Sequence, residues 1–188
     1  AVYDRYKKDP LWRLLYVPQQ TCNGVEGHFN GNSAAHLRRK GITEDRWVDT
    51  SCDIVRLVAT ACPTVPLAFE VHEVLDSAAV PQRILTQMTK EFPDGRFGAA
   101  MWWLSGKDTV YPALLSVIKA YAGPKYAQCI GRSDDKWRFG NADFRTVFAQ
   151  AVTLGVQYIE VWPYDLQKNT FPKEYDAFTA RVRYSTAG

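Results

Sequence analysis

The sequence predicts an α/β fold built around a parallel β-sheet. Short apolar runs alternate along the chain with amphipathic stretches, which is the pattern of consecutive βα units. The runs are continuously apolar, as expected for strands that are covered on both faces of the sheet. Five of them are expected to be strands: Leu14–Val17, Val65–Val71, Phe97–Leu104, Tyr126–Ile130 and Val156–Trp162.

The stretches that follow the strands carry helix boundaries and an apolar face. Thr43–Cys62 starts with two acidic residues, which the helix dipole favours in a first turn. In Asn141–Gly155, Asn141 is a suitable N-cap and Gly155 fits the left-handed position after a helix. The expected helices are Thr43–Cys62, Ser77–Phe92, Thr109–Gly123, Asn141–Gly155 and Lys173–Val182.

Five parallel strands fit two architectures, a five-stranded doubly wound sheet or part of a (β/α)8 barrel of the TIM type. A complete barrel needs about 250 residues, and this chain has 188. Residues 1–12 look like the end of a preceding helix and its loop, and no glycine-rich phosphate loop follows the first strand. The sequence therefore favours the C-terminal five units of a barrel, with residues 1–188 as one α/β domain.

Composition excludes several classes of function. Lys and Arg outnumber Asp and Glu by 23 to 20, and this small excess indicates neither a nucleic-acid nor a membrane-surface partner. No apolar run approaches the roughly 20 residues that span a bilayer. The four cysteines form no C-x2-C pair, and the three histidines do not have the spacing of metal ligands, so no metal site is expected. The cysteines are expected to be free thiols.

Three glutamates lie at the carboxyl ends of predicted strands, where parallel α/β proteins bind their ligands. Glu26 follows the first strand in an Asn-Gly-x-Glu-Gly stretch, and Glu70 and Glu160 end the second and fifth strands. A charge inside an apolar strand is unfavourable unless it is paired or faces a cavity. Pairing of Glu160 with Arg132 is the structural alternative to a catalytic role.

Aromatic residues, 13% of the chain, are interleaved with these carboxylates. Aromatic faces cover the apolar side of a sugar ring, and two carboxylates can act as acid and as nucleophile or base on a glycosidic bond. The predicted catalytic residues are therefore Glu26, Glu70 and Glu160. The predicted substrate-binding residues are Asn23, His28, His72, Trp102, Trp103, Arg132, Trp162 and Tyr164, with one of the two adjacent indoles expected in the core.

Two stretches resemble bacterial TIM-barrel glycoside hydrolases, specifically β-galactosidase-like and related retaining enzymes. Residues 9–17 (DPLWRLLYV) with the following Gly24-Val25-Glu26 resemble the fourth strand and its loop. Residues 148–166 (FAQAVTLGVQYIEVWPYDL) are similar to the closing helix and eighth strand. The resemblance covers most of the chain in outline and implies hydrolysis of a glycosidic bond.

The resemblance allows two alignments. If the visible strands are four to eight, Glu26 matches the acid/base carboxylate, but the end of strand seven, residues 128–132, carries no carboxylate. If they are three to seven, Glu70 takes the acid position and Glu160 that of the nucleophile, and strand eight is not represented. The C-terminal pattern favours the first alignment.

The sequence thus predicts a glycoside hydrolase that needs no metal or organic cofactor. The main alternative is a non-catalytic or degenerate carbohydrate-binding barrel, and a further one is a doubly wound protein with an unrelated small-molecule site. The expected partner is a carbohydrate, with neither nucleic acid nor membrane. Because a partial barrel exposes two strand edges, the missing strands are expected from an N-terminal part of the precursor or from a partner chain.

Overall fold

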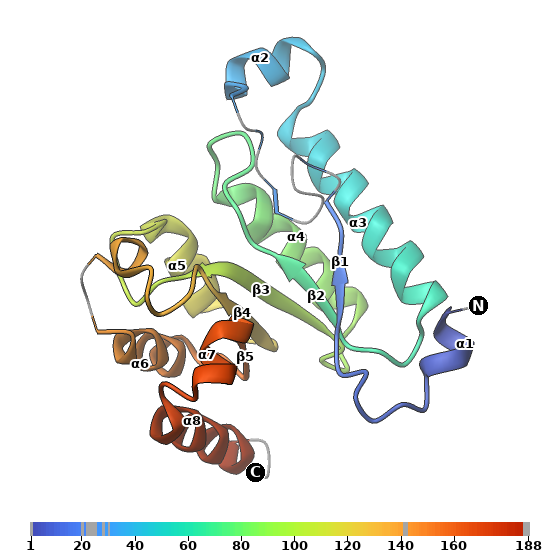
Figure 1. The fold of residues 1–188 in the computed structure, drawn as a ribbon. Coiled ribbons are helices and arrows are strands. Elements are labelled where there is room, and N and C mark those ends of the chain that lie inside the picture. Colours follow the sequence, from blue (N-terminus) through green and yellow to red (C-terminus); the bar gives the residue numbers. More distant parts are fainter. Residues whose placement is uncertain are drawn as a thin grey trace.

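The computed structural model describes residues 2–19, 21, 26–27, 29, 31–140 and 143–185, and Figure 1 shows their arrangement. Within these residues five strands form a parallel sheet in sequential order. The strands are β1 (Leu15–Val17), β2 (Leu67–Glu70), β3 (Phe97–Leu104), β4 (Lys125–Cys129) and β5 (Tyr158–Glu160). The predicted α/β fold with a parallel sheet is confirmed.

The helices include all five that the sequence predicts and several short ones that it does not. The predicted helices are α3 (Glu44–Ala61), α4 (Ala79–Glu91), α5 (Pro112–Ala120), α6 (Arg145–Leu154) and α8 (Pro172–Ser185). The shorter elements are α1 (Val2–Tyr6), α2 (Ala34–Arg39), the 3-10 helix η1 (Lys136–Phe139) and α7 (Pro163–Lys168). Of these, only α1 fits an expectation, that of a helix end before the first strand.

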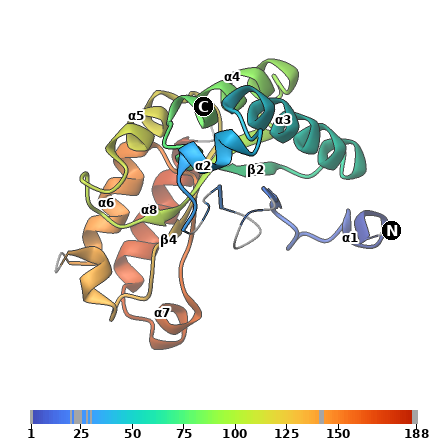
Figure 2. The same cartoon turned by 90° about the horizontal axis from the view of Figure 1, so that it is seen from above.

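The sheet is strongly curved. The Tyr16 hydroxyl of β1 donates a hydrogen bond to Glu160 Oε2 of β5 at 3.0 Å, although three strands lie between them. In a flat sheet four strand spacings would separate these strands by roughly 19 Å. Figure 2 shows helices α3 to α6 following one another around the outer side of the arc.

The strand order is the order of consecutive units in a (β/α)8 barrel. Doubly wound sheets of the common types have orders such as 2-1-3-4-5, in which the reversal places helices on both faces. In a sequential order, right-handed crossovers place the helices on one face. We call the helix-covered side of the sheet the outer face and the opposite, concave side the inner face.

Alternate residues of each strand point to the two faces. The outer-face residues belong to the main apolar core and are almost fully buried; they include Val17, Leu67, Phe69, Phe97, Met101, Ala127 and Cys129. The inner-face residues include Tyr16, Glu70, Trp102, Tyr126, Gln128 and Glu160. This pattern follows from the two-residue period of a β-strand.

Two predicted boundaries are corrected by local backbone constraints. The fifth strand was expected over Val156–Trp162 but is shorter, because Gly155 ends α6 at φ 76° and the Val156 N–H bonds to the Ala151 carbonyl at 2.9 Å. At its other end Pro163 starts α7. Helix α6 begins at Arg145 rather than at the predicted Asn141, which lies outside the described residues.

The second strand and the helix after β3 are also shorter than the predicted Val65–Val71 and Thr109–Gly123, whereas the start of α3 agrees with the expectation. The Thr43 side chain caps α3 by accepting a hydrogen bond from the Arg46 N–H at 3.2 Å. Cys52, Cys62 and Cys129 are free thiols, as predicted, while Cys22 lies outside the described residues. No helix within the described part of the chain is both long and apolar enough to cross a bilayer.

Candidate functional site

A cavity of about 580 Å³ lies at the carboxyl ends of the strands. Each strand contributes to its wall, either directly or through the loop that follows it. The contributors used below are Glu26 after β1, His72 after β2, Trp102 and Trp103 of β3, Gln128 of β4 and Trp162 after β5. The structure therefore brings together residues that are more than 130 positions apart in the sequence.

Glu70, at the end of β2, is a buried carboxyl group of which only one oxygen has hydrogen-bond partners among the described residues. It is 1% exposed, and its Oε2 accepts hydrogen bonds from the Gly27 N–H and the Gln19 amide, both at 3.1 Å. Its Oε1 has no hydrogen-bond partner among the described residues. Burial raises the pKa of Glu70 well above its usual range; the Gly27 hydrogen bond opposes this shift and the Glu26 carboxylate adds to it.

The loop after β1 passes closely over Glu70 because residue 27 is a glycine. A Cβ at Gly27 would lie 2.8 Å from Gln19 Oε1 and 2.9 Å from a methyl carbon of Val74. Without that side chain, the Gly27 amide reaches Glu70 and the adjacent Glu26 reaches the cavity wall. Gly27 and the adjacent Glu26 thus place a second carboxylate close enough to Glu70 to affect its pKa.

Glu160, at the end of β5, is half-buried and receives its hydrogen bond from Tyr16. It lies in register with Gln128, and the Tyr16 ring packs edge-on against Trp102 at 4.6 Å between centroids. Burial and the neighbouring Glu160 charge raise the pKa of Tyr16, so its hydroxyl remains a donor. The alternative partner expected from the sequence, Arg132, is not the group that binds Glu160.

The three predicted indoles all line the cavity, but in different ways. Trp103 is 4% exposed and donates its N–H to the Val71 carbonyl at 2.9 Å, whereas Trp102 is half-buried on the inner face. One of the two was expected in the core, and Trp103 belongs to the apolar core although it also reaches the cavity. The β3–β4 register shifts between Met101 and Leu104, which alters the alternation and lets both rings reach the wall.

Trp162 is the most accessible of these indoles, at 40% exposed. It lies beyond the end of β5, at the N-cap of α7, and donates its N–H to the Cys129 carbonyl at 2.9 Å. This bond fixes the edge of the ring to β4 and leaves a face available to the cavity. The sequence predicted Trp162 as the last residue of the fifth strand. In the structure β5 ends at Glu160, and Trp162 lies just beyond it.

The predicted residue His72 lines the cavity beside Tyr111, which the sequence analysis did not select. The two rings are 5.0 Å apart, and Tyr111 lies 5.2 Å from Trp103. Tyr111 adopts a left-handed backbone conformation at φ 48°, which is uncommon for a bulky residue and is frequent at functional sites. The following Pro112 marks the helix start after β3, and this signal could have placed Tyr111 in the loop at the carboxyl end of β3 instead of inside the predicted helix Thr109–Gly123.

Two predicted binding residues lie away from the cavity wall. The Arg132 guanidinium stacks on the Tyr164 ring at 4.7 Å and pairs with Asp134 at 2.8 Å. Neither Arg132 nor Tyr164 is among the residues that line the cavity. The two side chains contact each other on the surface, away from the cavity. The structure therefore does not bring Arg132 and Tyr164 to the site. The predicted residues Asn23 and His28 lie outside the described residues.

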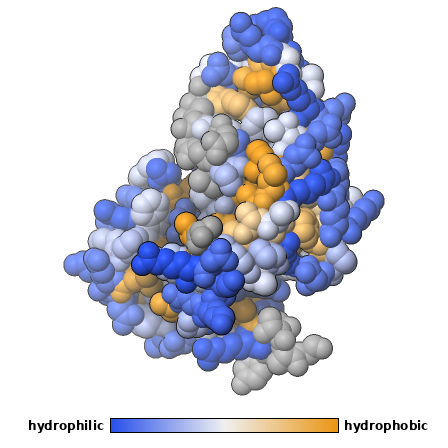
Figure 3. Space-filling view, turned by 90° about the vertical axis from the view of Figure 1, so that its right-hand side faces the viewer, coloured by the Kyte–Doolittle hydropathy of each residue, from blue (hydrophilic) through white to orange (hydrophobic). Residues whose placement is uncertain are grey.

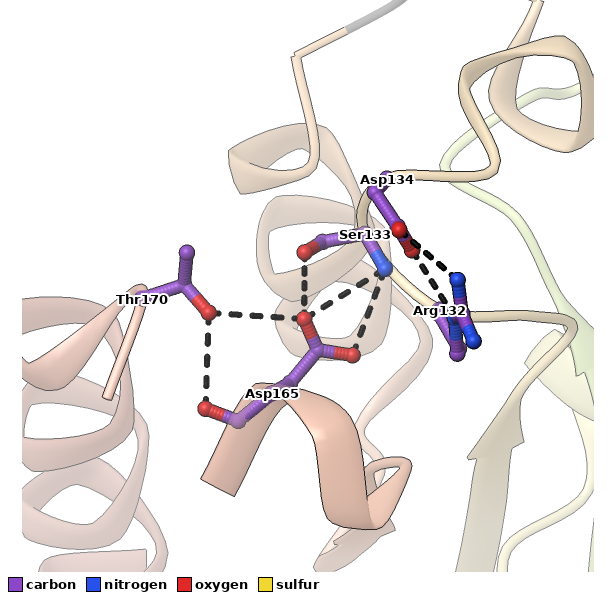
Figure 4. A network of polar contacts seen from close by, with 5 residues as sticks. All are labelled: Arg132, Ser133, Asp134, Asp165 and Thr170. Carbon is purple, nitrogen blue, oxygen red and sulfur yellow. Dashed lines mark hydrogen bonds and ion pairs between the residues drawn. The ribbon is translucent and has the colours of Figure 1, made fainter. Parts of the chain in front are cut away.

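The loop after β4 is attached to α7 through a buried carboxylate, Asp165 (Figure 4). Asp165 is fully buried and accepts hydrogen bonds from the N–H and hydroxyl of Ser133 and, at 3.4 Å, from the Thr170 hydroxyl. The same turn holds Trp162, whose carbonyl accepts from the Asp165 N–H at 2.9 Å. The network therefore fixes the loops on which Trp162 and the residues near Arg132 lie.

The described part of the chain contains no cluster of His, Cys, Asp and Glu side chains suited to a metal ion. Its cavity instead combines carboxyl, indole, imidazole, phenol and amide groups. The residues that sequence reasoning missed, besides Tyr111, are Gln19, Tyr16, Gln128 and Arg138. All four are polar residues that no local motif marks. Gln19, Tyr16 and Gln128 have neighbours from other βα units, whereas Arg138 contacts Gly131 and Trp137 of its own loop.

Comparison with known protein families, with characterised proteins and with solved structures finds no match to this chain. The geometry of the cavity is therefore the basis for the functional proposal.

Proposed function

We propose that this protein hydrolyses glycosidic bonds with two carboxyl groups, Glu70 and Glu160, that lie beside an indole-lined cavity. Neither is itself a lining residue: Glu70 bonds the Gly27 N–H next to Glu26, and Glu160 is in register with Gln128. The observation that carries the proposal is the chemical contrast between Glu70 and Glu160. One is a buried carboxyl with a raised pKa, and the other is a half-buried carboxyl that accepts a hydrogen bond from Tyr16. Glycoside hydrolysis needs such a pair, because one group donates a proton while the other acts as an ionised nucleophile or base.

The proposed roles follow from these environments. Glu70 protonates the leaving oxygen, since burial and the nearby Glu26 charge favour its protonated form. Glu160, at the end of β5 and three strands away from Glu70, acts as nucleophile or as the base that activates water. Trp102 and Trp162 offer aromatic surface for the sugar ring. These roles correspond to the alignment in which the visible strands are three to seven of a retaining TIM-barrel glycoside hydrolase.

A second candidate function is carbohydrate binding without hydrolysis. It is favoured by the burial of Glu70, which is 1% exposed behind Gln19 and Gly27. A proton donor must come within hydrogen-bond reach of the leaving oxygen. If the loop that carries Gly27 keeps this position with substrate bound, Glu70 is a structural group and the cavity only binds.

Single glutamate-to-glutamine variants distinguish the two functions. Turnover is measured on a panel of 4-nitrophenyl glycosides and on oligosaccharides, and binding is measured on a glycan array. Glu70→Gln and Glu160→Gln are expected to lower turnover about 10²–10⁴-fold and to retain binding. Glu44→Gln, on the exposed start of α3, is the matched control and keeps the wild-type rate.

The possible outcomes distinguish the hydrolase from the binding protein. Binding of oligosaccharides by the wild type with no turnover of any substrate supports the binding protein over the hydrolase. Turnover that survives both substitutions contradicts the assigned roles. If the wild type neither binds nor cleaves any carbohydrate, both functions are wrong.

We also propose that the five units are part of a larger (β/α)8 barrel whose other strands come from elsewhere in the precursor or from a partner chain. The curvature and sequential strand order support this, and so does a mostly apolar hollow of about 690 Å³ beside β5, lined partly by Leu14, Tyr158 and Phe178. Figure 3 shows apolar side chains exposed in the middle of one face of the molecule. A soluble monomer of 21.3 kDa in native mass spectrometry would contradict this proposal.

A further inference from the structure

Arg138, in the 3-10 helix after β4, is a cation on the cavity wall that the proposed hydrolysis does not use. The side chain is half-buried and its position is built by two neighbours. Its guanidinium carbon lies 4.6 Å from the centroid of the Trp137 ring. A Cβ on Gly131 would lie 2.5 Å from Arg138 Cδ, so only a glycine there permits the close approach of the arginine stem.

The charge of Arg138 has no acidic partner among the described residues. Within the part of the chain that the structure describes, none of the ion pairs or side-chain hydrogen bonds involves its guanidinium. Arg132 provides the contrast within the same loop. It also stacks on an aromatic ring, at 4.7 Å from Tyr164, but it lies off the cavity wall and pairs with Asp134 at 2.8 Å.

An oriented guanidinium in a cavity is suited to an anionic ligand group. Its planar donors match the two oxygens of a carboxylate and the oxygens of a sulfate ester, and stacking on an aromatic ring reduces the orientational freedom lost on binding. Hydroxyl groups of a neutral sugar are bound adequately by amides and carboxylates, which the cavity also contains. A cation on the cavity wall that has no acidic partner among the described residues adds selectivity for charge.

We propose that the carbohydrate bound in this cavity carries an anionic substituent, a uronic acid carboxylate or a sulfate ester, that pairs with Arg138. This inference rests on the proposed carbohydrate function and specifies the substrate class of that site. The substituent lies on the side of the cavity formed by the loop after β4.

Matched pairs of sugars test the proposal. Binding to the ¹⁵N-labelled protein is titrated by NMR with methyl glucuronide against methyl glucoside, methyl galacturonide against methyl galactoside, and glucose 6-sulfate against glucose. At least one acidic member is expected to bind about tenfold or more tightly than its neutral partner. The carboxylate and sulfate pairs identify which anion is preferred, and added NaCl reduces the preference.

Three variants assign the effect to Arg138. Arg138→Gln is expected to abolish the preference for the acidic sugar and to leave binding of the neutral sugar unchanged. Gly131→Ala keeps the guanidinium but displaces its stem, and it is expected to weaken the same preference. Arg132→Gln is the matched control, because it removes an aromatic-stacked arginine of the same loop from outside the cavity, and it keeps the preference.

The results distinguish this inference from the proposed function. Equal binding of the acidic and neutral members, or a preference that persists in Arg138→Gln, overturns the role of Arg138 and leaves the carbohydrate function standing. Absence of binding by every sugar at high millimolar concentration, acidic or neutral, overturns both.

Discussion

The outer and inner faces of the sheet are formed by alternate residues of the same strands, yet they differ in composition and in packing. On the outer face, Phe69, Phe97 and Met101 are at most 1% exposed and belong to the apolar core. On the inner face, Tyr16 and Glu160 are half-buried and bonded across the hollow. The outer face therefore contributes most of the apolar burial, and the inner face holds polar and titratable groups.

This division shows why a strand can carry a carboxyl group without disrupting the fold. Phe69 and Glu70 are adjacent and both buried, but only Phe69 is packed by the helices. Glu70 points to the inner face, where Gln19 and Gly27 supply hydrogen bonds that offset part of its desolvation. Substitutions on the two faces should consequently have separable effects.

The largest expected effect on stability comes from the outer face. Phe69→Ala removes a fully buried ring and is expected to lower the free energy of unfolding by about 3–5 kcal/mol, because the surrounding helices and strands cannot close the cavity. The inner-face control, Gln128→Ala, should change it by less than about 1 kcal/mol. Urea unfolding measures both, and an equal loss in the two variants would remove the distinction between the faces.

An intermediate effect is expected at the loop that covers the inner face. Gly27→Ala places a methyl group within 2.9 Å of both Gln19 and Val74, so the loop must move away from Glu70. Loss of the buried hydrogen bonds to Glu70 should lower the free energy of unfolding by about 1–3 kcal/mol. Urea unfolding measures this change as well. Wild-type stability in this variant would indicate that the loop does not hold Glu70 in place.

The smallest expected effect is a change in the pH dependence of stability. Because burial makes the pKa of Glu70 higher in the folded than in the unfolded chain, its contribution to stability is fully present below about 4.5, the value for an unperturbed glutamic acid. The contribution is lost as the pH rises toward the folded pKa, at roughly 1 kcal/mol per pH unit. Glu70→Gln, which resembles the protonated form, should remove this slope.

Thermal unfolding of both proteins across the pH range from acid to neutral measures this slope. The Glu70→Gln variant should be at least as stable as the wild type at neutral pH, since it avoids a buried charge. Parallel pH profiles for the two proteins would mean that Glu70 does not titrate differently in the folded state.

Much of the fold could be predicted from local patterns in the sequence. The strand Phe97–Leu104 has its predicted bounds, and Thr43 and Gly155 act at the ends of helices as their residue types suggested. The short elements α2, α7 and η1 were missed because they are too brief to show an apolar period. The apolar pattern alone predicted a fifth strand over Val156–Trp162. The structure has a shorter β5, because Gly155 ends the helix before it and Pro163 starts the helix after it.

The candidate site was predicted less completely. Strand ends indicated Glu26, Glu70, His72 and the indoles, because the carboxyl ends of parallel strands meet at one edge whatever the details of the sheet. Arg132 and Tyr164 were misplaced, since each satisfies the other on the surface. Arg138 was missed because its place on the cavity wall depends on the close approach of its side chain to Gly131.

The amino-acid sequence by itself determined the alternation of strands and helices, the apolar outer face and the edge of the sheet at which polar side chains gather. These depend on residue periodicity and on local backbone preferences, which act over a few positions. Only the tertiary structure decided that the sheet curves until Tyr16 meets Glu160 and that Gln19 and Gly27 enclose Glu70. Those contacts join residues 144, 51 and 43 positions apart, and they form only when the helices pack on the outer face and fix its curvature.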